Sequence, residues 1–185
     1  IWHVIILNIL KKKTRPKTIC VIGDGKSNFI INALINFPNV KIYSINLTEV
    51  LINDYLILKK SRILKKNKIC VISNINQTID YKKKIFLIPA NLKNIINKVK
   101  IDLFVSIECL QELNISEQKK YLRIISKQKN AFFYLLEREI KTLPGGEKNC
   151  KIIFNKQASF SNTFYNTKFP FIHYQTKSKR HALVK

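Results

Sequence analysis

The sequence contains no methionine and few acidic residues. Its 185 residues include 11 Asp and Glu against 34 Lys and Arg, which gives a formal net charge of +23. A basic excess of this size normally indicates a nucleic acid or another anionic surface as the partner. Here the lysines are spread along the chain, and no aromatic residues interleave with them in a recognition motif. We therefore interpret the charge as background, and nucleic acid is the less favoured partner.

The chain also lacks a C-x-x-C pair and any apolar run long enough to cross a membrane. Its four cysteines, at positions 20, 70, 109 and 150, are too widely separated for a metal-binding motif. Three of them lie in or beside apolar strand-like runs, which is typical of free buried thiols in a reducing cytoplasm. The apolar residues 1–10 are too few for a transmembrane helix, and basic residues follow them, whereas in a signal peptide they come first. We expect a cytoplasmic protein without a metal site.

The isoleucine at position 1 and the absence of methionine suggest a piece of a longer protein. We therefore interpret residues 1–16 as an N-terminal segment, the end of a preceding region, and residues 17–185 as one α/β domain. A chain of this length with 46% hydrophobic residues can bury a core of its own.

Residues 17–29 (KTICVIGDGKSNF) join a short apolar strand to an apolar helix through two of the four glycines. The strand runs into Gly-Asp-Gly at 23–25, and apolar residues at helical spacing begin at Phe29. In an α/β sheet this arrangement presents backbone N–H groups and a helix N-terminus to a ligand, either a nucleotide phosphate or the nucleoside end of a cofactor. The glycines permit close approach because they have no Cβ. Ser27 or Asn28 is suited to cap the helix.

Strands alternate with helices along the rest of the chain, which is typical of an α/β domain with a mainly parallel sheet. The spacing of apolar residues predicts further strands at 40–45, 68–73, 85–88, 101–107, 131–136 and 150–154. It predicts further helices at 50–63, 92–99 and 116–127. Strand-like residues 169–175 and 181–184 have no helix between them, so we expect a C-terminal antiparallel hairpin.

Two phosphate-binding motifs do not fit the turn. A nucleoside-triphosphate loop, G-x-x-x-x-G-K-[ST], needs a glycine where Cys20 stands inside the strand. The dinucleotide motif needs a third glycine where Asn28 stands. Gly-Asp-Gly followed by the polar Asn46 at the end of the second strand instead resembles the cofactor site of S-adenosylmethionine-dependent methyltransferases. In that family the turn packs against methionine and ribose, the end of the second strand meets the ribose hydroxyls, and the end of the next strand meets adenine.

Three further stretches resemble the sugar O-methyltransferases of bacterial surface-polysaccharide loci. N-L-T-E-V-L with Y-L, within residues 46–56, is similar to that family's D-L-P-E-V-L … Y-L signature. D-L-F-V-S-I through L-Q-E-L, at 102–113, followed by Tyr121, is similar to its D-L-F-x-N … S-x-Q-E-M … Y-F segment. F-F-Y followed by L-P-G-G-E, within 132–147, resembles its F-F-Y … L-P-G-G-E run. The resemblance implies a Rossmann-like class I methyltransferase fold, with helices on both faces of a twisted, mainly parallel sheet.

The resemblance also implies S-adenosylmethionine as cofactor and a sugar or glycan precursor as substrate, and it is compatible with an oligomer. Asn46 stands where the family has an acidic residue, although an amide oxygen still accepts a hydrogen bond. Ser27 stands where a glycine is usual. The residues implied to bind the cofactor are Gly23, Asp24, Gly25, Asn46, Leu47, Asn91, Ser106 and Ile107.

Methyl transfer to a sugar hydroxyl requires an aligned nucleophile and a group that removes its proton. Glu108 and Glu112 follow the strand at 101–107, where sites in open α/β sheets lie, and Glu112 occupies the family's Q-E position; His173 is a third candidate base. Each has a structural alternative: a carboxylate at a helix N-terminus for Glu112, a solvated loop charge for Glu108 and a surface imidazole for His173. Weaker candidates, explained by a charged loop or a surface position, are Glu137, Glu139, His181 and His3.

The leading hypothesis is therefore an O-methyltransferase that acts on a sugar or surface-polysaccharide precursor. The alternative is a non-catalytic module of the same fold, which contacts RNA or a partner protein through its basic surface. Asn46 and Ser27 motivate this alternative. Binding of RNA through many phosphates weakens steeply as the salt concentration rises, so the salt dependence of binding distinguishes this alternative from the leading hypothesis.

Overall fold

The structure is a computed structural model that describes residues 2–63, 68–138, 141–145, 148–149, 163–168 and 179–184. The chain divides into two compact units, Ile1–Leu103 and Phe104–Lys185. The glycine turn lies in the first unit, and the candidate bases Glu108 and Glu112 lie in the second.

Four parallel strands form the sheet of the first unit, in the order β3-β4-β2-β1. Tyr43 of β2 lies between Cys20 of β1 and Phe86 of β4, and its ring stacks on that of Phe86 at 4.6 Å. The interior strands are almost continuously apolar, as strands covered on both faces must be. The four strands are β1 (Thr18–Ile22), β2 (Lys41–Asn46), β3 (Ile69–Val71) and β4 (Ile85–Pro89).

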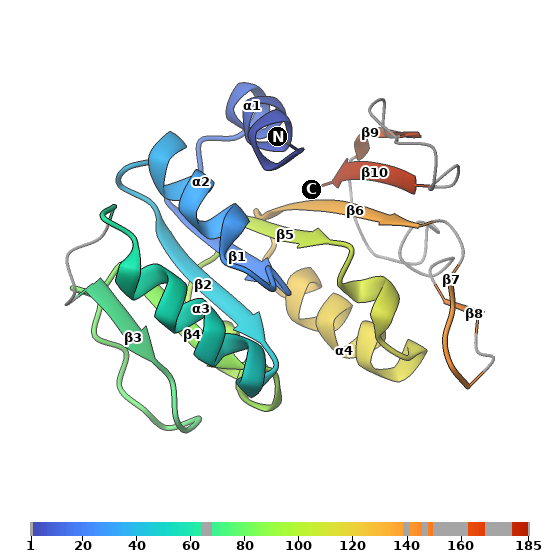
Figure 1. Cartoon of the computed structure of the whole chain (residues 1–185). Helices are drawn as coiled ribbons and strands as arrows, with labels where there is room; N and C mark the ends of the chain where they lie inside the picture. Colours follow the sequence, from blue (N-terminus) through green and yellow to red (C-terminus); the bar gives the residue numbers. More distant parts are fainter. Residues whose placement is uncertain are drawn as a thin grey trace. The chain divides into compact units, whose positions relative to one another are not determined.

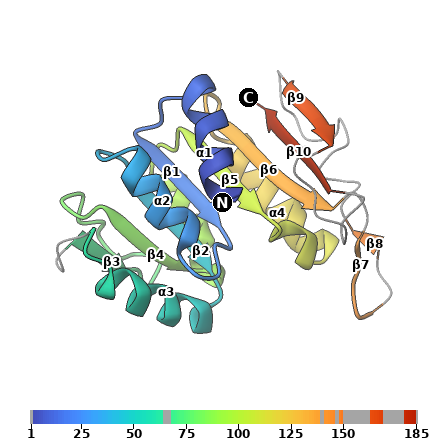
Figure 2. The same cartoon turned by 45° about the horizontal axis from the view of Figure 1, so that its top comes forward.

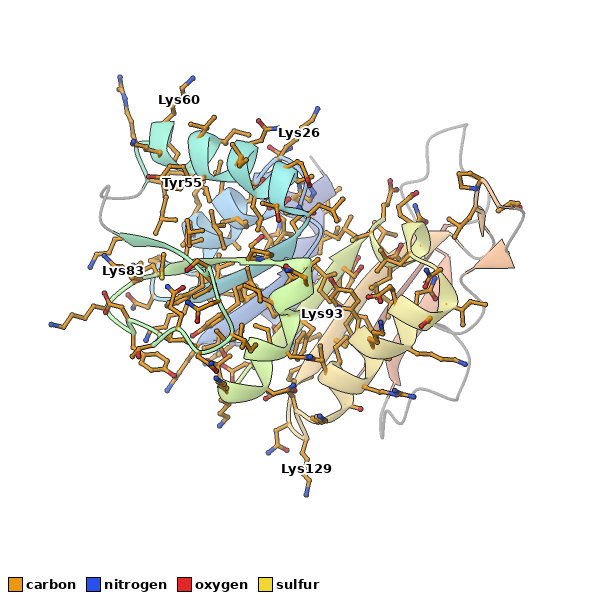
Figure 3. All side chains as sticks on the ribbon, turned by 90° about the horizontal axis from the view of Figure 1, so that it is seen from below. Lys26, Tyr55, Lys60, Lys83, Lys93 and Lys129 are labelled. Carbon is orange, nitrogen blue, oxygen red and sulfur yellow. The ribbon has the colours of Figure 1, made fainter. Side chains whose placement is uncertain are left out.

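Helices cover both faces of this sheet. Figure 3 shows Tyr55 and Lys60 of α3 on one side of the strands and Lys93 of η2 on the other. Helix α1 lies against α2 (Figure 2). At this contact the rings of His3 and Phe29 meet edge to face at 6.1 Å. The helices are α1 (Trp2–Lys13), α2 (Asn28–Asn36), α3 (Thr48–Lys60) and the 3-10 helix η2 (Ala90–Lys98).

The predicted helix at 92–99 is of the 3-10 type and begins earlier than expected. It starts directly after Pro89, which ends β4. Leu92 and Ile95 are three residues apart, and in a 3-10 helix side chains at this spacing lie above one another. Ile95 and Ile96 are buried in the unit.

The second unit has the strand order β5-β6-β10-β9, and β10 pairs antiparallel with both β6 and β9 (Figure 1). Helix α4 is capped by Asn114, whose Oδ1 accepts the N–H of Glu117 at 2.9 Å. A short antiparallel pair, β7 and β8, flanks Pro144 and Gly145. The elements are β5 (Leu103–Ile107), η3 (Leu110–Glu112), α4 (Ile115–Ser126), β6 (Phe132–Arg138), β7 (Lys141–Thr142), β8 (Lys148–Asn149), β9 (Thr163–Lys168) and β10 (Lys179–Val184).

The C-terminal strands differ in position from the expected hairpin. Strand β9 ends at Lys168, before the predicted strand at 169–175, and that stretch lies outside the described residues together with the predicted strand at 150–154. The structure therefore shows β9 and β10 as an antiparallel pair, and the residues that connect them lie outside the described part of the chain. Among the helices of the described residues, none combines the length and the apolar character needed to cross a bilayer.

Candidate cofactor and catalytic site

The turn after β1 uses left-handed backbone conformations. Gly23 and Gly25 have φ values of 74° and 65°, which glycine adopts without strain. The N–H of Gly23 donates to the carbonyl of Ile45 on β2 at 2.9 Å, so the turn stays joined to the neighbouring strand. A Cβ built on Gly25 would meet no atom within 4 Å. The turn therefore borders open space at Gly25.

Asp24 caps helix α2 from within the turn. Its carboxylate accepts the N–H of Phe29 at 2.9 Å and the N–H of Ile30 at 2.8 Å. Burial raises the pKa of Asp24 to about 6, although the two N–H groups act in the opposite direction. These backbone donors are thus already engaged by a carboxylate of the chain, which disfavours a phosphate at this helix end and favours the nucleoside end of a cofactor.

The expectation that Ser27 or Asn28 caps α2 is wrong. Ser27 stands at the N-cap position with a φ of 53°, and its side chain makes no capping hydrogen bond. Its hydroxyl donates instead to Oδ1 of Asp54 on α3, at 2.8 Å. In this left-handed conformation the serine hydroxyl faces α3, which leaves the capping role to Asp24.

Asp54 is hydrogen-bonded to the turn through Ser27, and sequence reasoning missed it. The residue is fully buried, and burial raises the pKa of its carboxyl group, whereas the Ser27 hydroxyl and the Asn46 amide lower it. Nδ2 of Asn46 and Oδ2 of Asp54 are both buried without a well-formed hydrogen bond. Asp54 shares the buried face of α3 with Leu51 and Leu58, at helical spacing. A single acidic residue at the helical spacing of buried leucines was the feature of the sequence that could have identified it.

Replacing Asp24 with alanine is expected to lower the free energy of unfolding by about 1–2 kcal/mol, because the first turn of α2 loses its side-chain acceptors. Since folding raises the pKa of Asp24 from 3.8 to about 6, its contribution to stability is largest below the lower value and falls as pH rises through the higher one. The loss should therefore be larger at about pH 4 than at about pH 8. Urea titrations of wild type and variant at the two pH values measure this loss of unfolding free energy. A loss that is larger at the alkaline pH contradicts the raised pKa of Asp24.

The other predicted cofactor-binding residues of the first unit share one edge of its sheet. Strands β1, β2 and β4 are parallel, so their carboxyl ends lie together. Asn46 ends β2, and its Oδ1 accepts the N–H of Leu47 at 3.0 Å. Leu47 is 60% exposed and offers apolar surface directly after the end of β2. Asn91 is exposed in the first turn of η2, just after β4.

In the second unit, Ser106 is buried and its hydroxyl donates to Oε1 of Glu137 at 2.7 Å. The Ser106 side chain is therefore occupied within the protein, and Ile107, which ends β5, is half-buried. Glu108 follows with a φ of 55° and donates its N–H to the carbonyl of Leu136. Glu112 ends η3, is exposed, and accepts a hydrogen bond from Nε2 of Gln111 at 3.3 Å.

Glu137, ranked low from the sequence, is fully buried at the end of β6. Burial raises its pKa to about 7, opposed by hydrogen bonds from Ser106 and from the backbone of residues 109–111. Glu137 lies two residues after Leu135 on β6, so both side chains are on the same, buried face of the strand. This alternation was the feature of the sequence that could have indicated its burial. His173, Glu139 and the side chain of His181 lie outside what the structure describes.

Within the described residues, no three His, Cys, Asp or Glu side chains gather in a way that could hold a metal ion. Cys20 is buried, and Cys70 and Cys109 are half-buried free thiols. A pocket of about 510 Å³ opens at the other edge of the first unit's sheet, where β1 and β2 begin. It is lined by Lys11, Arg15, Pro16, Lys17, Asn36, Phe37, Pro38, Asn39 and Val40, so it is separate from the glycine turn.

No protein-family model and no curated protein sequence matches this chain. Solved structures do match. The methyltransferase domain of bacterial CtHen1 has a TM-score of 0.66 at 12% identity, over 100% of this chain and 96% of that one. An O-methyltransferase family protein from Burkholderia thailandensis has a TM-score of 0.61 at 8% identity, over 100% of this chain and 56% of that one.

Human N-acetylserotonin methyltransferase, in complex with SAM, has a TM-score of 0.58 at 13% identity, over 100% of this chain and 50% of that one. The chain thus spans about half of several methyltransferases that it matches, and nearly all of the CtHen1 domain. Other matches were solved with SAH or with sinefungin. The chain has the Rossmann-like α/β fold of class I methyltransferases.

Proposed function

We propose that this chain is an S-adenosylmethionine-dependent O-methyltransferase that acts on a sugar or glycan precursor. The observation that carries the proposal is the turn at 23–25, which has open space at Gly25 and a helix N-terminus already capped by Asp24. Such a turn suits an uncharged nucleoside group better than a phosphate. Structural neighbours solved with SAM, SAH or sinefungin support the same cofactor.

The first unit carries the residues that would hold the cofactor. Gly23 and Gly25 allow close approach of its methionine and ribose parts. Oδ1 of Asn46 can accept a hydrogen bond from a ribose hydroxyl, although it currently accepts the N–H of Leu47. Leu47 offers apolar surface, and Asn91 offers an amide at the end of β4. These roles are the ones that the resemblance to S-adenosylmethionine-dependent methyltransferases implies for these positions.

When bound, S-adenosylmethionine supplies an activated methyl group that an oxygen nucleophile can attack in line. The protein's task is to align the hydroxyl and to accept its proton, and alignment alone contributes on the order of 7–11 kcal/mol to lowering such a barrier. Glu108 and Glu112 are the described candidates for the proton acceptor, and His173 is a further candidate from the sequence. Glu112 is exposed and therefore accessible to a substrate.

The sugar substrate rests on the three stretches that resemble sugar O-methyltransferases, within 46–56, 102–121 and 132–147. The structural neighbours act on varied acceptors: their names include a mitomycin 7-O-methyltransferase, an N-acetylserotonin methyltransferase and a glycopeptide N-methyltransferase. The fold therefore does not identify the acceptor, and the proposal of a sugar depends on the resemblance of these three stretches.

Isothermal titration with S-adenosylhomocysteine tests the cofactor proposal. We expect a saturable heat at ligand concentrations up to about 1 mM. Absence of heat, together with retention of an oligonucleotide at low but not at high salt, would instead support the RNA-binding alternative. A thin-layer or mass-spectrometric screen of nucleotide sugars with labelled cofactor then tests the acceptor class.

A further inference from the structure

Glu137 is a buried carboxylate that accepts hydrogen bonds from Ser106 of β5 and from the segment after β5. Its Oε1 accepts the Ser106 hydroxyl at 2.7 Å and the N–H of Leu110 at 3.2 Å. Its Oε2 accepts the N–H of Gln111 at 3.3 Å, and the backbone of Cys109 also donates to it. A carboxylate has acceptor sites on both oxygens, so one side chain can hold several successive backbone groups.

The segment held in this way includes a strained residue. Glu108 has a φ of 55°, a conformation that costs a non-glycine residue about 1–2 kcal/mol when its surroundings impose it. Its N–H donates to Leu136, the residue directly before Glu137. Strand β6 therefore holds the segment twice, by the main chain at Leu136 and by the side chain at Glu137.

The groups that Glu137 holds lie between the two predicted proton acceptors. Leu110 and Gln111 separate Glu108 from Glu112, and both are buried, whereas Glu112 is exposed. A hydrophobic side chain at 137 would fill space but would leave the buried Ser106 hydroxyl and backbone N–H groups without their acceptor. Burying a carboxylate is costly, and packing alone gives no reason to place one here.

We propose that Glu137 is a positioning residue that fixes residues 108–112 through its carboxylate oxygens, and thereby sets the placement of Glu108 and Glu112. This inference rests on the proposed function for its catalytic consequence, and on the hydrogen bonds within the second unit for its structural part. The residue acts through the backbone it holds and does not itself touch a substrate.

Glu137→Gln keeps the shape of the side chain but replaces one acceptor oxygen with a donor group. In amide hydrogen exchange followed by NMR on the full chain, we expect Leu110 and Gln111 to exchange at least about tenfold faster, with little change in α4 and β6. Ser106→Ala is the matched control, because it removes one donor to Glu137 and leaves the carboxylate bonded to the backbone. The Leu110 N–H also donates to the Ser106 hydroxyl at 3.4 Å, so the comparison depends on Gln111, whose amide exchange the control should leave nearly unchanged.

Unchanged exchange at Leu110 and Gln111 in the Glu137→Gln variant overturns the proposal, and so does an equal acceleration throughout the second unit, which indicates a general stabilising role only. Once an acceptor is found, the same variant should lower kcat while the affinity for S-adenosylhomocysteine stays within about twofold of wild type. If wild type binds no S-adenosylhomocysteine, the proposed function fails, and the exchange measurement still decides whether Glu137 holds the segment.

Discussion

Gly25→Leu is expected to weaken the binding of S-adenosylhomocysteine by at least about 100-fold, because the new side chain occupies the open space that a cofactor needs at the turn. A leucine at a φ of 65° also costs about 1–2 kcal/mol of folding stability, since left-handed backbone suits glycine. The chain should nevertheless fold, because the added Cβ meets no atom within 4 Å. Isothermal titration gives the affinity, and urea unfolding gives the stability.

Gly145→Leu is the matched control. Gly145 is exposed near β7, its backbone is not left-handed, and a Cβ there also meets nothing within 4 Å. This variant should bind S-adenosylhomocysteine with the affinity of wild type and unfold at a similar urea concentration. Equal affinities for the Gly25 and Gly145 variants would remove the glycine turn from the cofactor site.

Asp54→Ala is expected to lower the free energy of unfolding by about 2–3 kcal/mol, because the buried Ser27 hydroxyl loses its acceptor at 2.8 Å and keeps only the main-chain carbonyl of residue 54 at 3.5 Å. Asp54→Asn should cost only about 1 kcal/mol. Its Oδ1 can still accept from Ser27, and the neutral amide avoids the desolvation that raises the pKa of Asp54. Urea unfolding at neutral pH compares the two variants.

A double-mutant cycle with Ser27→Ala isolates the hydrogen bond between these side chains. The two alanine substitutions should be non-additive, since either one already breaks the bond at 2.8 Å. Additive losses would mean that Asp54 stabilises the unit through other contacts. An asparagine variant as unstable as the alanine variant would contradict the role of Asp54 as a hydrogen-bond acceptor.

Patterns within short windows predicted most of the secondary structure. The predicted strand at 85–88 corresponds to β4 and the predicted helix at 116–127 corresponds to α4, with bounds that differ by about one residue. The parallel pairing of β1 with β2 follows from the helix that separates them in sequence. The methyltransferase fold was likewise expected from the turn and the motif stretches, and the structural neighbours confirm it.

The role of each polar residue was harder to predict. Asp24 was predicted to bind the cofactor, which stays a prediction, and the sequence did not reveal that its carboxylate caps α2. Ser27 fits the sequence pattern of a helix cap, but its left-handed backbone directs it to Asp54. Glu137 was interpreted as a charged loop residue and is fully buried.

The sequence by itself determined the alternation of strands and helices and the position of the glycine turn, because apolar spacing and glycine's backbone freedom act within a few residues. Only the tertiary structure decided which polar groups meet. Ser27 and Asp54 are 27 residues apart, and Ser106 and Glu137 are 31 residues apart. Such pairs form only when separate elements pack, and burial then makes each polar group depend on the partner that packing provides.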